Sequence, residues 1–190
     1  MLRSVIPALL AAIVSCTGGL ALADDPALRR YELPNLDTLE LTLPSGWVDA
    51  VDAPPGGVPL TILLTPAGGA PFEVHVTPQW SEAADSAVMD ADALRQAVRE
   101  AALGAQAQAV EETLEIRRLQ GASGVGFYYA ATDRAPLPEE FRFMTQGALQ
   151  AGDLVLWFTI LTNDGQDSVV ADALALLQSA GHRGTGIDRR

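Results

Sequence analysis

The chain has 190 residues, a formal net charge of −12 and a hydrophobic content of 48%, which is the composition of a globular protein with one domain. It contains no lysine, and its densest basic clusters are only pairs, Arg29-Arg30, Arg117-Arg118 and the terminal Arg189-Arg190. Because nucleic acids and anionic membrane surfaces are bound by clustered basic side chains, this composition excludes a nucleic-acid partner and membrane attachment through charge.

The first 25 residues have the pattern of an export signal. Arg3 supplies a short positive region, an apolar segment runs from Val5 to Val14, and Ala21-Leu22-Ala23 forms a small-x-small cleavage pattern. We therefore expect residues 1–23 to be removed after Ala23, which would leave a periplasmic or secreted mature chain. The apolar segment is shorter than the roughly 20 residues of a membrane-spanning helix, so we expect no transmembrane span in the mature chain.

Cys16, the only cysteine of the chain, belongs to an alternative signal. Ile13-Val14-Ser15-Cys16 resembles a bacterial lipobox, in which cleavage precedes the cysteine and its thiol is lipidated. The product would be lipid-anchored in the cell envelope, and this tether is the one membrane attachment that the pattern predicts. Under either cleavage the mature domain has no free thiol, so we expect no disulfide, thiol nucleophile or thiolate metal site.

The first part of the mature chain predicts an arm and then strands. Residues 24–36 are polar, include two prolines and lack a clean period, so we expect a loosely packed N-terminal arm. Leu39–Leu43 alternates apolar and polar side chains, as a half-buried strand does, and Pro44-Ser45-Gly46 predicts the turn that ends it, with Trp47 beneath. Further strands are expected at Leu60–Thr65 and Phe72–Thr77.

The second half predicts two helices around four more strands. Ala91–Ala109 has a helical period, with Asp90 or Asp92 placed as its N-cap. The following strands are expected at Thr113–Gln120, Val125–Thr132, Phe141–Leu149 and Leu154–Leu161. The last of these is apolar on both alternating faces, which is typical of a central strand covered on both sides. A final helix follows Asn163, and residues 183–190 are expected to form a flexible tail.

These elements predict an α+β fold in which two main helices enclose a largely antiparallel sheet of about six or seven strands, an α/β/α layered sandwich. We place this single domain at residues 37–182. The element order resembles that of the PsbP-like superfamily, and Leu41-Thr42-Leu43-Pro44-Ser45-Gly46-Trp47 looks like the strand-Pro-x-Gly-Trp start common there. The stretches Met144–Gly147 and Phe158–Gly165 are similar to uncharacterised exported proteobacterial members.

The resemblance covers Leu39 to Ala180 and implies a non-enzymatic accessory or binding role. Members of the superfamily include extrinsic photosystem II subunits, a Ran-binding nuclear import factor and many uncharacterised exported bacterial proteins. Neither photosystem assembly nor Ran binding carries over, because no partner-contact residue can be matched.

Few residues of this sequence predict chemistry. His75, between Glu73 and Thr77 on the more polar face of its strand, is a candidate base or ligand, and a surface strand residue is the alternative. His182 lies in the tail. The segment Asn163–Asp167 carries oxygen ligands around a glycine, but its spacing is not that of an EF-hand, so helix capping is favoured over calcium binding. No serine lies in a Gly-x-Ser-x-Gly setting.

Aromatic side chains recur at strand period and predict either sheet core or an apolar ligand cleft: Tyr128, Tyr129, Phe141, Phe143, Trp157 and Phe158. We take His75, Tyr129 and Trp157 as ligand-cleft candidates and expect no catalytic, cofactor-binding or metal residue. The sequence therefore favours an exported non-catalytic accessory or binding protein of the bacterial cell envelope with an envelope protein as partner. The alternative is a small-molecule carrier or hydrolase that uses a cleft between sheet and helix.

Overall fold

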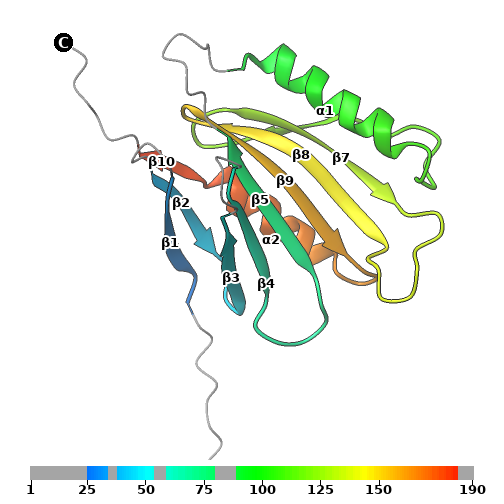
Figure 1. Ribbon diagram of the computed structural model, residues 1–190, viewed down its shortest axis with the longest axis horizontal. Coiled ribbons are helices and arrows are strands. Elements are labelled where there is room, and N and C mark those ends of the chain that lie inside the picture. The colour runs from blue at the N-terminus through cyan, green and yellow to red at the C-terminus, as the bar shows by residue number, and fades with distance from the viewer. Residues whose placement is uncertain (1–24, 34–37, 54–58, 80–88, 184–190) are drawn as a thin grey trace, which may run out of the picture.

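The structure is a computed structural model that describes residues 25–33, 38–53, 59–79 and 89–183. Its main sheet consists of β3 (Trp47–Asp52), β4 (Thr61–Pro66), β5 (Glu73–Gln79), β6 (Arg117–Gln120), β7 (Val125–Thr132), β8 (Phe143–Ala151) and β9 (Leu154–Thr162). These seven strands are antiparallel and lie in the order β3-β4-β5-β9-β8-β7-β6 (Figure 1). β9 is the middle strand, as its continuous apolar sequence predicts.

A smaller antiparallel sheet contains β1 (Ala27–Glu32), β2 (Thr38–Leu43) and β10 (Gly181–Arg183), in the order β1-β2-β10. The prediction of a loosely packed arm is therefore wrong for residues 27–32, which form β1. Tyr31 and Leu33 are buried, and the two prolines fall at positions 26 and 34, outside the strand. Residue 183, expected to start a flexible tail, instead ends β10 and pairs with Thr38.

Helices α1 (Ala91–Ala105) and α2 (Asp167–Gln178) cover opposite faces of the main sheet (Figure 1). α1 begins where the Asp90 carboxylate accepts a hydrogen bond from the Ala93 amide at 2.7 Å, as the capping pattern predicts. It buries Leu94, Val98 and Ala102 against β7 and β8. α2 and the small sheet share the other face, and together they form the larger core.

The α+β fold with two helices around an antiparallel sheet is thus confirmed, although one outer layer combines a helix with a small sheet. Trp47 follows the predicted turn as the first residue of β3, and its ring centroid lies 4.6 Å from that of Phe72. Two expected bounds are wrong. Helix α1 ends at Ala105, and the strand expected from Thr113 begins at Arg117.

Several predictions fall on residues outside the described part of the chain. These are the signal peptide at 1–23 with its cleavage site after Ala23, the lipidation site at Cys16, the end of the arm at 34–36, and the tail beyond residue 183. Within the described ranges, no helix is long and apolar enough to span a bilayer.

Two glutamates stabilise the fold in a pH-dependent way. Glu40 of β2 contacts Arg30 of β1 at 2.9 Å and Arg183 of β10 at 3.2 Å, so the three strands of the small sheet are joined by ion pairs. The hydrogen bond from Arg30 and the charge of Arg183 lower the pKa of Glu40. For Glu111, burial acts to raise the pKa, but hydrogen bonds from the amide and hydroxyl of Thr132 outweigh it, so the pKa is lowered.

Both carboxyls bind protons less readily in the folded state. Their contribution to stability is therefore complete above the ordinary glutamate pKa of about 4.3 and is lost as the pH falls through their lowered folded-state pKa. We expect the thermal midpoint to fall between pH 6 and pH 3, and the Glu40→Gln/Glu111→Gln variant to show a smaller fall. An unchanged pH slope in this variant, measured by circular dichroism, would mean that neither carboxyl contributes.

Candidate functional site

The three residues predicted to line a cleft lie on one face of the main sheet, the face that α1 covers in part. His75 pairs with Thr159, Thr159 with Gln146, and Gln146 with Tyr129, so these four side chains form one row across β5, β9, β8 and β7. Trp157 lies in the next row and packs half-buried against the core beneath α1. The structure therefore brings the three candidates to one face, in two neighbouring rows.

Tyr129 is a core residue. It is 0% exposed, and its hydroxyl donates to Gln146 Oε1 at 2.5 Å and lies 3.4 Å from the carbonyl oxygen of Ala101 on α1. Gln146 in turn donates to the hydroxyl of Thr159 at 3.1 Å. Burial raises the pKa of Tyr129. These contacts give the ring and its hydroxyl a structural role, with no surface on which a ligand could lie.

His75 lies at the open part of the same face. Its Nε2 is 2.8 Å from Glu73 Oε2, and the two side chains are 36% and 38% exposed. The described residues hold no group of three or more His, Cys, Asp or Glu side chains with metal-binding geometry. His182, expected in an exposed tail, lies in β10, where its Nδ1 accepts from the Asp153 amide at 3.4 Å.

A hollow of about 470 Å³ lies on the opposite face, between the sheet and α2; we call it the α2 hollow. Its floor is formed by side chains of β7, β8 and β9: Tyr128, Ala130, Phe143, Thr145 and Thr162. α2 contributes the wall: Asp167, Val170, Ala171 and Leu174. α2 packs on β9, β2 and β6, and beside it Ala130 of β7 stays exposed and Phe143 of β8 stays partly exposed.

Two threonines in the floor are nearly buried and contribute hydroxyls to the hollow. Thr145 is 6% exposed and Thr162 is 3% exposed, and neither hydroxyl bonds to a described residue. Thr145 pairs with Ile160, so Thr162 is its diagonal neighbour on β9. The two side chains are nearly buried, but their hydroxyl oxygens are not enclosed and can bond to water or a ligand in the hollow.

The two ends of the α2 hollow carry opposite charge. Arg117 of β6 lies at one end, beside Tyr128, and forms no salt bridge with a described residue. Asp164 and Asp167 lie at the other end, where Arg142 pairs with Asp164 at 3.3 Å and leaves Asp167 free of an ion pair among the described residues. The segment considered for calcium binding or capping thus forms the acidic rim of a hollow. Gln166, the N-cap, makes no side-chain capping bond.

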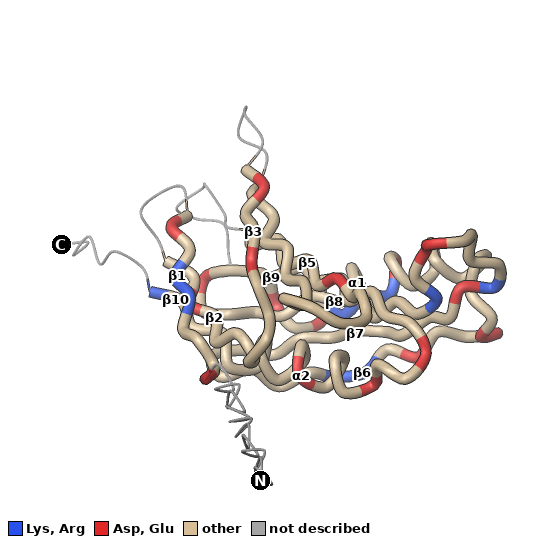
Figure 2. The backbone as a smooth tube through the Cα atoms, turned by 90° about the horizontal axis from the view of Figure 1, so that it is seen from below, with Lys and Arg blue, Asp and Glu red and all other residues tan. Residues whose placement is uncertain are grey.

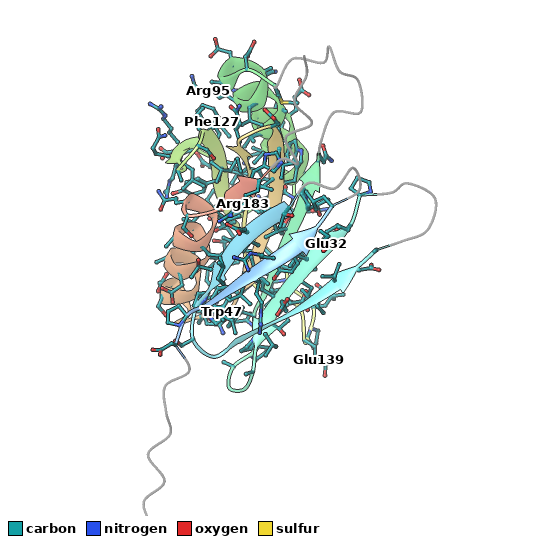
Figure 3. All side chains as sticks on the ribbon, turned by 90° about the vertical axis from the view of Figure 1, so that its left-hand side faces the viewer. Glu32, Trp47, Arg95, Phe127, Glu139 and Arg183 are labelled. Carbon is teal, nitrogen blue, oxygen red and sulfur yellow. The ribbon has the colours of Figure 1, made fainter. Side chains whose placement is uncertain are left out.

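A second hollow of about 430 Å³ lies between α1 and residues 113–116; we call it the α1 groove. Arg95, Arg99 and Leu103 line it from α1, and Glu115 and Ile116 from the other side. Figure 3 shows Arg95 on α1, at the end of the molecule opposite Trp47 and Glu139. Leu103 is 67% exposed.

The described arginines differ in whether they have an acidic partner. Arg29, Arg30 and Arg183 pair with acidic side chains around the small sheet, at 2.9 to 3.2 Å. Within the described ranges, the pairs at α1 and β6 form no salt bridge: Arg95, Arg99, Arg117 and Arg118. Figure 2 shows these basic positions on α1 and β6, well separated from those on β1 and β10. Three of these arginines line the hollows without an acidic partner among the described residues: Arg117 at the α2 hollow, and Arg95 and Arg99 at the α1 groove.

Sequence reasoning named Tyr128 and Phe143 among the aromatic residues that could line a cleft, but it missed Arg117, Thr145 and Thr162. A signal for Thr145 was present, because a threonine in the inward-facing register of a central strand is a polar group that needs a partner. The position of the hollow had no such signal, since it depends on where α2 lies.

No protein-family model matches the chain, and no curated protein matches it. Among solved structures, the chain is similar to cyanobacterial PsbP (CyanoP) from Synechocystis sp. PCC 6803, determined in solution. The sequence identity is 14% and the TM-score is 0.47, over 90% of this chain and 98% of that chain. A likeness of this degree carries no inference about partners or ligands, and the nearer resemblance to exported proteobacterial proteins stays a prediction.

Proposed function

We propose that this chain is an exported accessory protein of the cell envelope that acts by binding a protein partner along helix α1. The observation that carries the proposal is the α1 groove, where Arg95 and Arg99 form no salt bridge with a described residue and Leu103 is 67% exposed. The export pattern of residues 1–23 supports a partner in the periplasm or at the envelope.

The chemistry of the groove indicates what the partner presents. Arg95, Arg99 and Leu103 follow one another at four-residue spacing, so they form one stripe along α1. A single exposed leucine is ordinary, but arginines beside exposed apolar surface are typical of protein interfaces. Guanidinium groups bind carboxylates through two parallel hydrogen bonds. The matching partner is a short acidic segment with an apolar side chain for Leu103.

The net charge of the whole protein also favours binding of an acidic segment at the groove. With a net charge of −12, most of the surface repels an acidic segment, and the unpaired arginines offer it a local attraction. Charge complementarity of this kind fixes where and how a partner docks more than it adds affinity. Glu115 on the opposite side of the groove would repel a misplaced carboxylate.

The test reverses the charge of the stripe. We expect the Arg95→Glu/Arg99→Glu protein, crosslinked in its native cells and purified, to retain about tenfold less of its partner than the unmodified protein, because like charges then face each other. Arg118→Glu is the matched control, since Arg118 is an exposed arginine of β6 outside the residues that line the groove. It should keep the partner.

Equal recovery of the partner by the doubly reversed protein and by the control would rule out the groove as the docking surface.

The intact mass of the purified protein in the same sample identifies its N-terminal residue. A chain that starts at Asp24 would support cleavage after Ala23, and a lipidated Cys16 would support the tethered form. A mass that includes residues 1–15 would contradict export by either route.

A further inference from the structure

We propose that the α2 hollow is a separate binding site for a short peptide with free termini, three residues long. The hollow lies on the opposite face of the sheet from the α1 groove, so this site is independent of the proposed protein partner. The ligand is identified by three features: two unbonded hydroxyls in the floor, opposite charges at the two ends, and small apolar side chains between them.

The hydroxyls match the backbone of an extended peptide. Thr145 and Thr162 are diagonal neighbours on adjacent antiparallel strands, a relation that separates residues by about 7–8 Å. In an extended tripeptide, the carbonyl oxygen of the first residue and the amide of the third residue point to the same side, so the two peptide groups present one acceptor and one donor to the floor. Each hydroxyl can donate to a carbonyl or accept from an amide. The two peptide groups of one tripeptide can therefore bond to both threonines.

The charged ends match the termini of the ligand. Tyr128, beside Arg117, pairs with Gly147, and Phe143 lies four residues further along β8, which is about 13 Å. A tripeptide in extended form spans roughly 10–11 Å. Its carboxylate would reach the guanidinium of Arg117, and its ammonium group would reach the free carboxylate of Asp167.

The middle of the hollow selects small side chains. Apolar side chains line this part of the hollow and offer no polar group to a ligand: Ala130 in the floor, and Val170, Ala171 and Leu174 in the wall. The hollow is open to solvent, so ligand side chains that point away from the floor contact water and not the protein. We therefore expect tolerance of sequence at these positions and a modest preference for free termini at both ends.

The test uses trialanine, N-acetyl-trialanine and trialanine amide as probes of the purified protein, with binding measured by calorimetry. Trialanine should bind saturably, and blocking either terminus should weaken binding about threefold to fivefold, the upper range for a solvent-exposed ion pair. Arg117→Ala should remove the preference for a free carboxylate and keep the preference for a free amine. Asp167→Asn should do the reverse. Thr145→Val should weaken all three probes by about fivefold.

Thermal unfolding of the free variants separates this function from a structural role. The Thr145 hydroxyl has no partner among the described residues, so Thr145→Val should not lower the midpoint of the free protein. A lowered midpoint would show that the hydroxyl supports the fold. Absence of saturable trialanine binding would overturn the proposal, as would an unchanged preference for the free carboxylate in Arg117→Ala.

Discussion

Replacing Gly147 by alanine should destabilise the fold by about 3 kcal/mol, the upper range for inserting an atom into a packed core. An alanine Cβ at this position would clash with the backbone oxygen of Phe127. It would also lie 2.6 Å from the Tyr128 Cβ and 2.8 Å from the Phe158 ring. Gly147 pairs with Tyr128 on one side and with Phe158 on the other. Its neighbours include backbone held by strand pairing on both sides, so the clash cannot be relieved by a rotamer change.

The same substitution at Gly104 is the matched control. Gly104 lies exposed near the end of α1, with nothing within 4 Å of the point that an alanine Cβ would occupy, so alanine should stabilise the protein by about 0.5–1 kcal/mol through helix propensity. Urea denaturation of the two variants measures both effects on one scale. If Gly147→Ala unfolds at the urea concentration of the unmodified protein, the strands around Gly147 are less tightly packed than the structure has them.

The elements that could be predicted from the sequence are those whose side-chain period is set by the core. β5 and β9 carry unbroken inward apolar residues, and α1 carries Leu94, Val98 and Ala102 at helical spacing below a capping Asp90. In each case the local pattern and the tertiary packing favour the same structure, so local reasoning suffices.

β1, β3 and β10 could not be predicted this way, because their pairing depends on distant partners. β10 has three residues and exists through its ladder with β2, far away in the sequence. β1 carries Leu28 at 51% exposure and two adjacent arginines, and its burial rests on Tyr31. A short edge strand with mixed polarity looks like a loop until its neighbour is known.

The ligand-cleft candidates show how much one residue of register matters. Tyr128 and Tyr129 are adjacent on β7, so their side chains point to opposite faces of the sheet. The α2 hollow uses Tyr128, whereas Tyr129 is enclosed beneath α1. The sequence indicated that aromatic residues would lie at this strand, but the face that stays open is decided by where α2 packs.

Tyr129→Ala should destabilise the protein by about 4 kcal/mol, because a fully buried aromatic ring beneath α1 is replaced by a cavity. Tyr129→Phe is the matched variant, since it keeps the ring and removes the hydroxyl. We expect it to cost about 0.5–1.5 kcal/mol, because Gln146 Oε1 then loses its hydrogen-bond donor in a partly buried position.

The two variants together separate a core residue from a ligand-binding residue. A tyrosine that lined an open cleft would tolerate alanine with a change of about 0.5 kcal/mol or less, as surface positions do. If chemical denaturation gives that small value for Tyr129→Ala, α1 does not enclose the ring. The face that carries His75 and Trp157 would then again be a candidate binding surface. A large loss for Tyr129→Ala and an intermediate one for Tyr129→Phe would assign this face to the core, because the ring and its hydroxyl would then each stabilise the contact between α1 and the sheet.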